Sequence, residues 1–205
     1  MLPFKLIYSD GYYLPIGEHV FPAEKYRRIR DRLLAEGVAE ANDFLDPKPA
    51  TDQDILLVHT QEYVHKLKTG TLSPREQMEL EIPYSPELVA SFWLAAGGSI
   101  LAGRQALSDG VGINIGGGFH HAFPDHGEGF CMIHDVAVAI RRLQRDGASG
   151  QRHSGDFCGK ANCRRAAAFS GAVDTGVAPA DRRSSGQNAR SAHRRGLHHF
   201  AASAQ

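Results

Sequence analysis

The stretch that decides the fold is Ile115–Ile140, which reads IGGGFHHAFPDHGEGFCMIHDVAVAI. It starts at the end of a short β-branched strand, Val111–Ile115, and runs directly into three glycines that let the backbone turn tightly. From the capping residue Asp135 onward, apolar residues at helical spacing predict an amphipathic helix that Asp146-Gly147 ends. Ligands of parallel α/β proteins bind where strands end, so the glycine turn predicts a functional site.

Two adjacent imidazoles, His120 and His121, follow the glycines. A histidine within hydrogen-bond reach of a bound water can act as its general base near neutral pH. A His-His pair without context is more often part of a solvated loop. Its position after a buried strand and three glycines favours the functional interpretation, so His120 and His121 are the candidate catalytic residues.

The other titratable residues of the stretch have simpler interpretations. Asp125, His126 and Glu128 lie among glycines and have the composition of a polar surface turn. His134 has no partner at the spacing of a metal site, so a capping or packing role is expected for it.

Outward from this stretch, strands and helices alternate as in an α/β protein. The predicted strands upstream are Lys5–Ser9 and Ile55–Val58, the second after a polar loop. The predicted helices span Pro22–Ala35, with Ile29 and Leu33 on its apolar face, a short segment capped by Thr60, and a long run from Ser85 to Asp109. In the long helix, Gly97-Gly98 and Gly103 predict close packing against a neighbour.

The run Gly116–Ala122, followed by Gly129-Phe130-Cys131 and Asp135–Ile140, resembles the active-site segment of the histone deacetylase family. The triple glycine with Phe119 is most similar to its class IV branch and to bacterial relatives. Leu57-Val58-His59-Thr60 is similar to another stretch of the family, and the resemblance covers residues 1–147. It implies the N-terminal part of an open parallel-sheet fold of the arginase–deacetylase type.

The resemblance also implies a function, which is zinc-dependent hydrolysis of an acetyl-lysine amide or a similar acylated amine. In that reaction His120 and His121 handle protons, and Gly129 and Phe130 line the tunnel that holds the acyl-lysine stem. The expected cofactor is zinc, and the expected partner is an acetylated lysine side chain or a small acylated amine. Acetylated polyamines are an alternative substrate class.

Residues 148–205 differ in composition from residues 1–147. Up to Gly150 there are 20 acidic and 14 basic residues, whereas residues 151–205 contain 3 and 9. The Asp-x-His pair and the later Asp and Tyr of the family find no match, since His153 and Asp156 have the wrong order and spacing. No metal ligand can be identified, and we expect this chain to be inactive by itself.

The rest of the tail is rich in Arg, Ala, Ser and Gly, which is typical of a GC-rich gene read out of frame. We hypothesise a frameshift between Gly147 and His153 and expect residues 148–205 to be disordered. A zinc site made by Cys158 and Cys163 with the tail histidines fits structural spacings poorly. The arginine pairs could contact nucleic acid, but few aromatic residues accompany them, so nucleic acid is not the expected partner.

Cellular location and solubility can also be predicted. Three unevenly spaced cysteines, with no membrane span and no signal peptide, predict a cytoplasmic protein. Half of an α/β sheet leaves a strand edge uncovered, so we expect poor solubility of the isolated chain.

Overall fold

The computed structural model describes residues 2–150, without the side chains of residues 148–150. Its sheet has three short parallel strands in the order β2-β1-β3. They are β1 (Lys5–Ile7), β2 (Phe44–Leu45) and β3 (Gly112–Asn114). Leu6 in the central strand lies opposite Phe44 on one side and Ile113 on the other. The predicted α/β class with a parallel sheet is confirmed.

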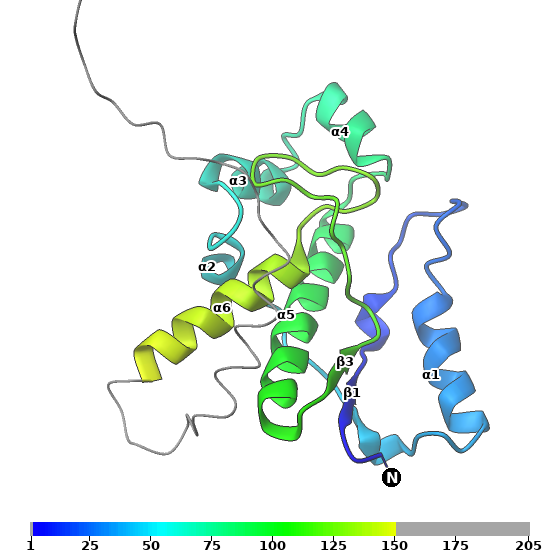
Figure 1. The fold of residues 1–205 in the computed structure, drawn as a ribbon. Helices are drawn as coiled ribbons and strands as arrows, with labels where there is room; N and C mark the ends of the chain where they lie inside the picture. The colour runs from blue at the N-terminus through cyan, green and yellow to red at the C-terminus, as the bar shows by residue number, and fades with distance from the viewer. Residues whose placement is uncertain (1, 151–205) are drawn as a thin grey trace, which may run out of the picture. The chain divides into compact units, whose positions relative to one another are not determined.

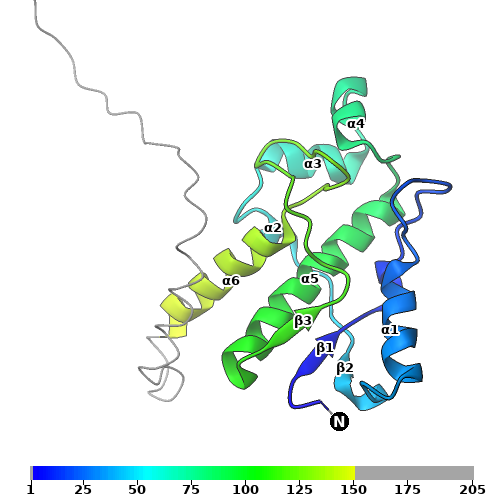
Figure 2. The ribbon, with the colours of Figure 1, turned by 45° about the vertical axis from the view of Figure 1, so that its right-hand side comes forward.

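Helices cover both faces of this sheet. They are α1 (Lys25–Ala35), α2 (Asp52–Ile55), α3 (Gln61–Thr69), α4 (Pro74–Leu80), α5 (Pro86–Asp109) and α6 (Asp135–Gly150), with short 3-10 turns at Asp10–Tyr12 and Ala41–Asp43. In two views the strands lie between α5 on one side and α1 on the other, and α6 crosses the outer side of α5 (Figures 1 and 2). None of the helices in the described part combines the length and apolarity of a membrane span.

Two of the helix starts predicted from capping residues, at Thr60 and Ser85, are correct. Thr60 accepts a hydrogen bond from the Tyr63 amide at the start of α3, and Ser85 accepts one from the Leu88 amide at the start of α5. Gly110 ends α5 in the left-handed conformation, at φ +84°. These signals act over three or four residues, which is why the sequence alone reveals them.

Helix α5 is the centre of the packing, and its glycines allow the close approach that the sequence predicted. A Cβ at Gly97 would lie 1.9 Å from the carbonyl oxygen of Lys48, and one at Gly98 would lie 1.9 Å from the Tyr12 hydroxyl. Gly103 leaves room for Leu143 of α6. A methyl group at Gly97 would overlap backbone atoms, and one at Gly98 would overlap the Tyr12 hydroxyl, so glycine at these positions lets α5 approach its neighbours closely.

The strand predicted at Ile55–Val58 is wrong, because Ile55 ends helix α2 and the next three residues form turns. A capping box decides this: Thr51 accepts from the Asp54 amide, and the Asp54 carboxylate accepts from the Thr51 amide. Short apolar runs are ambiguous between helix and strand. Strand β2 and helix α4 have no counterpart in the sequence-based prediction.

Three further expectations need correction. Helix α1 starts at Lys25 instead of Pro22, and its Ile29 is 44% exposed although it was expected to face inward. Strand β3 was expected to be buried, but Ile113 is 42% exposed because β3 is the edge strand of the described sheet. Helix α6 continues through Gly147 to Gly150. The predictions for residues 151–205 fall outside the described residues and stay predictions.

Candidate functional site

The segment between β3 and α6 forms the candidate site. It leaves the carboxyl end of β3, extends to α3 and α4, and returns to the start of α6 (Figures 1 and 2). Backbone hydrogen bonds fix its course: the Thr60 amide donates to the Pro124 carbonyl at 2.8 Å, and the Phe130 amide donates to the Leu80 carbonyl at 3.0 Å. The segment is therefore held at both of the helices that it reaches.

Each glycine of the turn is required for its own reason. A Cβ at Gly116 would lie 2.1 Å from the ring of Tyr12, and one at Gly117 would lie 2.6 Å from a carboxylate oxygen of Asp135. Gly118 has φ +99°, which side chains other than hydrogen rarely allow. The turn predicted from three glycines is thus a tight, fully specified structure.

The buried carboxylate of Asp135 fixes this turn by accepting hydrogen bonds from its backbone amides. Asp135 is 0% exposed, and its oxygens accept hydrogen bonds from the Phe119 amide at 2.8 Å, the Gly118 amide at 3.0 Å and the Ser99 hydroxyl. Burial raises the pKa of Asp135, and the three donors offset part of that effect. Asp135 was predicted to cap α6, but it is the first helical residue and its side chain serves the glycine turn instead.

Asn114 at the end of β3 extends the same network. Its amide nitrogen donates to the Ala95 carbonyl and to the Ser99 hydroxyl, each at 3.0 Å, and its side-chain oxygen accepts from the Gly116 amide at 3.2 Å. Strand β3, helix α5 and the glycine turn are therefore joined by side chains as well as by packing.

The two predicted catalytic histidines lie side by side at the exposed end of the turn. The ring centroids of His120 and His121 are 4.3 Å apart, with 36° between the ring planes. Nδ1 of His120 lies 3.0 Å from the carbonyl oxygen of Gly118 and donates to it, because a carbonyl oxygen can only accept. In the neutral ring the lone pair is therefore at Nε2, which is the state of a general base.

Of the two predicted tunnel residues, Gly129 lies beside this pair, whereas the ring of Phe130 packs against the N-terminal loop. Gly129 faces the ring of His121, since a Cβ there would lie 3.4 Å from its Cγ. Phe130 has φ +67°, which is unusual for a bulky residue and typical of strained functional positions. Its ring makes edge contacts with His19, at 5.1 Å between centroids, and lies 6.2 Å from Phe21. The structure thus adds His19 and Phe21, from the N-terminal loop, to the neighbourhood that the sequence predicted.

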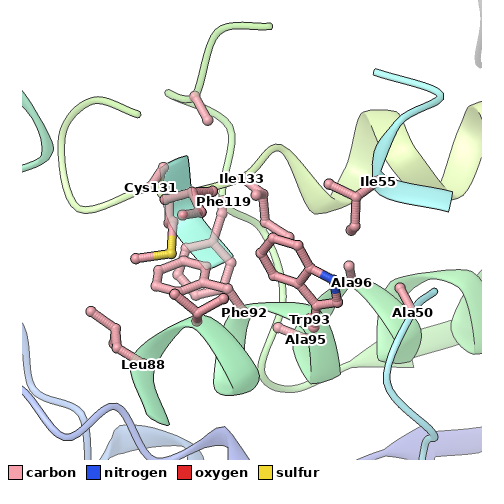
Figure 3. Packing of buried hydrophobic residues seen from close by; sticks show 14 of the residues in the cluster. Ala50, Ile55, Leu88, Phe92, Trp93, Ala95, Ala96, Phe119, Cys131 and Ile133 are labelled. Carbon is pink, nitrogen blue, oxygen red and sulfur yellow. The ribbon is translucent and has the colours of Figure 1, made fainter. Parts of the chain in front are cut away.

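The apolar residues of the segment anchor the histidine turn in the core. Phe119 packs on Phe92 of α5, with 4.6 Å between ring centroids, and Figure 3 shows Cys131 and Ile133 beside this pair. Burial raises the pKa of the Cys131 thiol, and the nearby backbone N–H groups of His121 and His120 offset part of the increase. Cys131 is thus a buried packing residue whose thiol lies near the backbone of the two histidines.

His59 joins the site to α3, a role that sequence reasoning missed. Its Nε2 accepts from the His134 amide at 3.0 Å, and its Nδ1 makes no hydrogen bond of good geometry within residues 2–150. Burial lowers the pKa of His59 to about 4, and the nearby Phe123 and Pro124 carbonyl groups offset this only in part. In the sequence, the one feature that pointed to His59 was its place in Leu57-Val58-His59-Thr60, which is similar to a stretch of the family.

The remaining polar residues behave as simple surface and capping groups. His134 Nδ1 accepts from the Ala137 amide at 3.2 Å, which is the predicted capping role. His126 lies 2.8 Å from an Asp125 oxygen and stacks on the exposed ring of Phe123. Glu128 is exposed, as expected for a polar surface turn.

The described donor set does not fit a zinc ion. Within residues 2–150, no three His, Cys, Asp or Glu side chains converge as a metal site requires. The carboxylate under the histidine turn, Asp135, already accepts from two backbone amides and a hydroxyl. Within residues 2–150, the candidate site therefore has two adjacent histidines and the ring of Phe130 in the same segment, and no cluster of side chains that could hold a metal.

Comparisons with known proteins show which family and which relatives the chain resembles. Residues 19–152 match the family model described as the histone deacetylase domain. Among curated proteins, the chain is 38% identical over 145 residues to an uncharacterized protein of Picosynechococcus, covering 70% of this chain. It is 32% identical over 145 residues to Histone deacetylase 2 of Arabidopsis thaliana, covering 66% of this chain.

The solved structures show the same likeness in three dimensions. An HDAC homolog from Aquifex aeolicus superimposes with a TM-score of 0.56 at 27% identity, covering 70% of this chain and 41% of that one. The chain spans 48% and 38% of the length of the two curated relatives.

Proposed function

Because the chain belongs to the histone deacetylase family, we propose that it carries the acyl-binding and proton-transfer half of an amidohydrolase site and does not hydrolyse amides by itself. The observation that carries the proposal is the pairing of His120 and His121, with ring centroids 4.3 Å apart and Nε2 of His120 left as an acceptor. Gly129 beside His121 and the left-handed backbone of the next residue, Phe130, support an acyl-amine substrate.

The proposed chemistry assigns a different task to each group. His120 accepts a proton from the attacking nucleophile through Nε2, and His121 delivers a proton to the leaving amine. Phe130 presents an aromatic face to the methylene stem of the acylated side chain, while Gly129 leaves room for that stem beside His121. The substrate class is an acetyl-lysine side chain or a small acylated amine, with acetylated polyamines as the alternative.

Zinc is the cofactor that family membership implies, and its usual tasks are to activate a water and to polarise the acyl carbonyl. The residues described between 2 and 150 do not fit the ion, so we assign no step to it. Two histidines alone would supply only a small part of the acceleration, which is why we propose that the chain is inactive by itself. From cysteine usage alone we also propose a cytoplasmic location.

Zinc content and acetate release test the proposed inactivity. After dialysis against zinc, we expect the full chain to hold less than stoichiometric metal. Acetate release from an acetyl-lysine peptide should equal that of a chain with both His120→Ala and His121→Ala. Stoichiometric zinc with turnover that the double variant abolishes would overturn the proposed inactivity.

Substrate binding is tested separately, by amide chemical shifts. An Nε-acetyl-lysine amide should shift the signals of Gly129 and His121, whereas unmodified lysine amide should not. Equal shifts with both ligands, or none with either, would contradict the acyl-amine assignment.

A further inference from the structure

Asp135 is connected to His120 by an unbroken path of hydrogen bonds through one residue. Its carboxylate accepts from the Gly118 amide at 3.0 Å, and the Gly118 carbonyl accepts from Nδ1 of His120 at 3.0 Å. The neighbouring Phe119 amide donates to the same carboxylate at 2.8 Å. Asp135 itself does not touch the exposed face of the histidine pair, so any effect on His120 passes through the turn.

The geometry of the turn leaves little freedom along this path. Gly118 is held at φ +99°, and Gly117 packs so closely that a Cβ there would lie 2.6 Å from an Asp135 oxygen. With the two amides fixed on the carboxylate, the direction of the Gly118 carbonyl is fixed as well. That carbonyl is an obligate acceptor, so it selects the ring form of His120 that carries a proton at Nδ1.

We propose that Asp135 is a positioning residue that sets the tautomer of His120 through Gly118, and thereby directs the basic nitrogen of His120 to the exposed side of the site. The inference deepens the proposed function, because a general base at this position needs its lone pair at Nε2. Ser99 steadies the carboxylate, since its hydroxyl donates to Asp135 and accepts from Asn114.

The substitution Asp135→Asn tests the path with a side chain of nearly the same shape. An amide offers one oxygen where the carboxylate offers two. With the amide oxygen in place of Oδ2, the Phe119 amide faces the NH₂ group and loses its acceptor. With the amide oxygen in place of Oδ1, the Gly118 amide faces the NH₂ group and keeps only its longer contact, of 3.3 Å, to that oxygen. The turn loosens, and the Gly118 carbonyl no longer holds Nδ1 of His120.

The readout is the tautomer of neutral His120, measured by ¹⁵N and ¹³C NMR of the ring at a pH of about 8.5, where an ordinary histidine is uncharged. We expect the wild-type chain to hold the Nδ1–H form and Asp135→Asn to give a mixture in which the Nε2–H form predominates. Ser99→Ala removes a donor to the same carboxylate but leaves both amides satisfied, so it should keep the wild-type tautomer. Asp43→Asn, at another fully buried aspartate far from the turn in sequence, should also keep it.

Two results would overturn the proposal. One is a wild-type His120 that is mainly in the Nε2–H form, which needs no variant and so does not depend on whether Asp135→Asn folds. The other is a folded Asp135→Asn chain with an unchanged tautomer. Because the measurement uses no metal and no substrate, its failure is distinct from a failure of the proposed function, which is judged by acetate release and ligand-induced shifts.

Discussion

His120 and His121 are exposed, whereas the polar side chains that hold their loop are buried. Asp135 and His59, at 0% and 3% exposure, each join segments that are distant in sequence. Buried polar groups of this kind are costly unless they are hydrogen-bonded. The proposed chemistry of the site therefore depends on buried residues as well as on the exposed histidines.

The burial of His59 predicts a loss of stability in mild acid. Its pKa is about 4 in the folded chain and about 6.5 when unfolded, so the unfolded chain binds the proton more tightly. The contribution of neutral, buried His59 to the free energy of unfolding is fully present above pH 6.5 and is lost as the pH falls toward 4. We expect the free energy of unfolding to fall by about 2 kcal/mol from this group between pH 7 and 5, as measured by urea denaturation.

The variant His59→Gln keeps an acceptor for the His134 amide and cannot titrate. It should lose most of this pH dependence, although the lowered pKa of His134 leaves a smaller component of the same sign. His65→Gln removes an exposed histidine of α3 and should leave the pH dependence unchanged. An identical pH profile for wild type and His59→Gln would contradict the assignment.

At the scale of elements, α5 determines how the other parts pack. Its glycines bring β3, α6 and the loop before α2 to the helix backbone, and the Ala50 amide donates to the Trp93 carbonyl of α5 at 2.9 Å. Glycine within a helix normally lowers stability by about 1 kcal/mol relative to alanine. In α5 the close contacts favour glycine over alanine, because a methyl group at these positions would overlap neighbouring atoms.

The substitution Gly97→Ala should therefore destabilise the chain. The new methyl group would lie 1.9 Å from the Lys48 carbonyl oxygen, and backbone atoms cannot move aside cheaply. We expect a loss of about 3 kcal/mol in the free energy of unfolding, the upper end for an overpacked core.

Gly147→Ala in α6 is the matched control, because nothing lies within 4 Å of its Cβ position. There the higher helix propensity should stabilise the chain by up to about 1 kcal/mol. A loss at Gly147 as large as that at Gly97 would refute the packing explanation.

At the scale of the whole molecule, the described sheet ends at β3, and apolar side chains lie along that edge. Val111 and Ile113 are 44% and 42% exposed, and Leu107 in the last turn of α5 is 39% exposed. Exposed strand edges with apolar residues favour association between chains. The poor solubility expected from the sequence thus has a specific candidate surface.

We expect the purified chain to self-associate in a concentration-dependent manner in sedimentation velocity, and Ile113→Lys to shift the distribution toward monomer. Val20→Lys places the same charge on a loop residue that is 84% exposed, and it should leave the distribution unchanged. A wild-type chain that sediments as a monomer at all concentrations would count against an active β3 edge.

By itself the sequence determined the features that depend on a few neighbouring residues. These are the glycine turn with its histidine pair, the helix starts at Thr60 and Ser85, and the family to which the motif belongs. Hydrogen bonds over three or four residues and the backbone freedom of glycine act locally, so their signals survive without the fold.

Only the tertiary structure decided the features that join distant segments. Ile55 lies in a helix although a strand was predicted there, and Ile113 is exposed at the edge of the sheet. Gly129 lies beside His121. The Asp135 carboxylate accepts from the amides of the glycine turn instead of capping its own helix. The physical reason is that the partners of these residues depend on which segments pack on α5, and no local pattern encodes a contact across tens of residues.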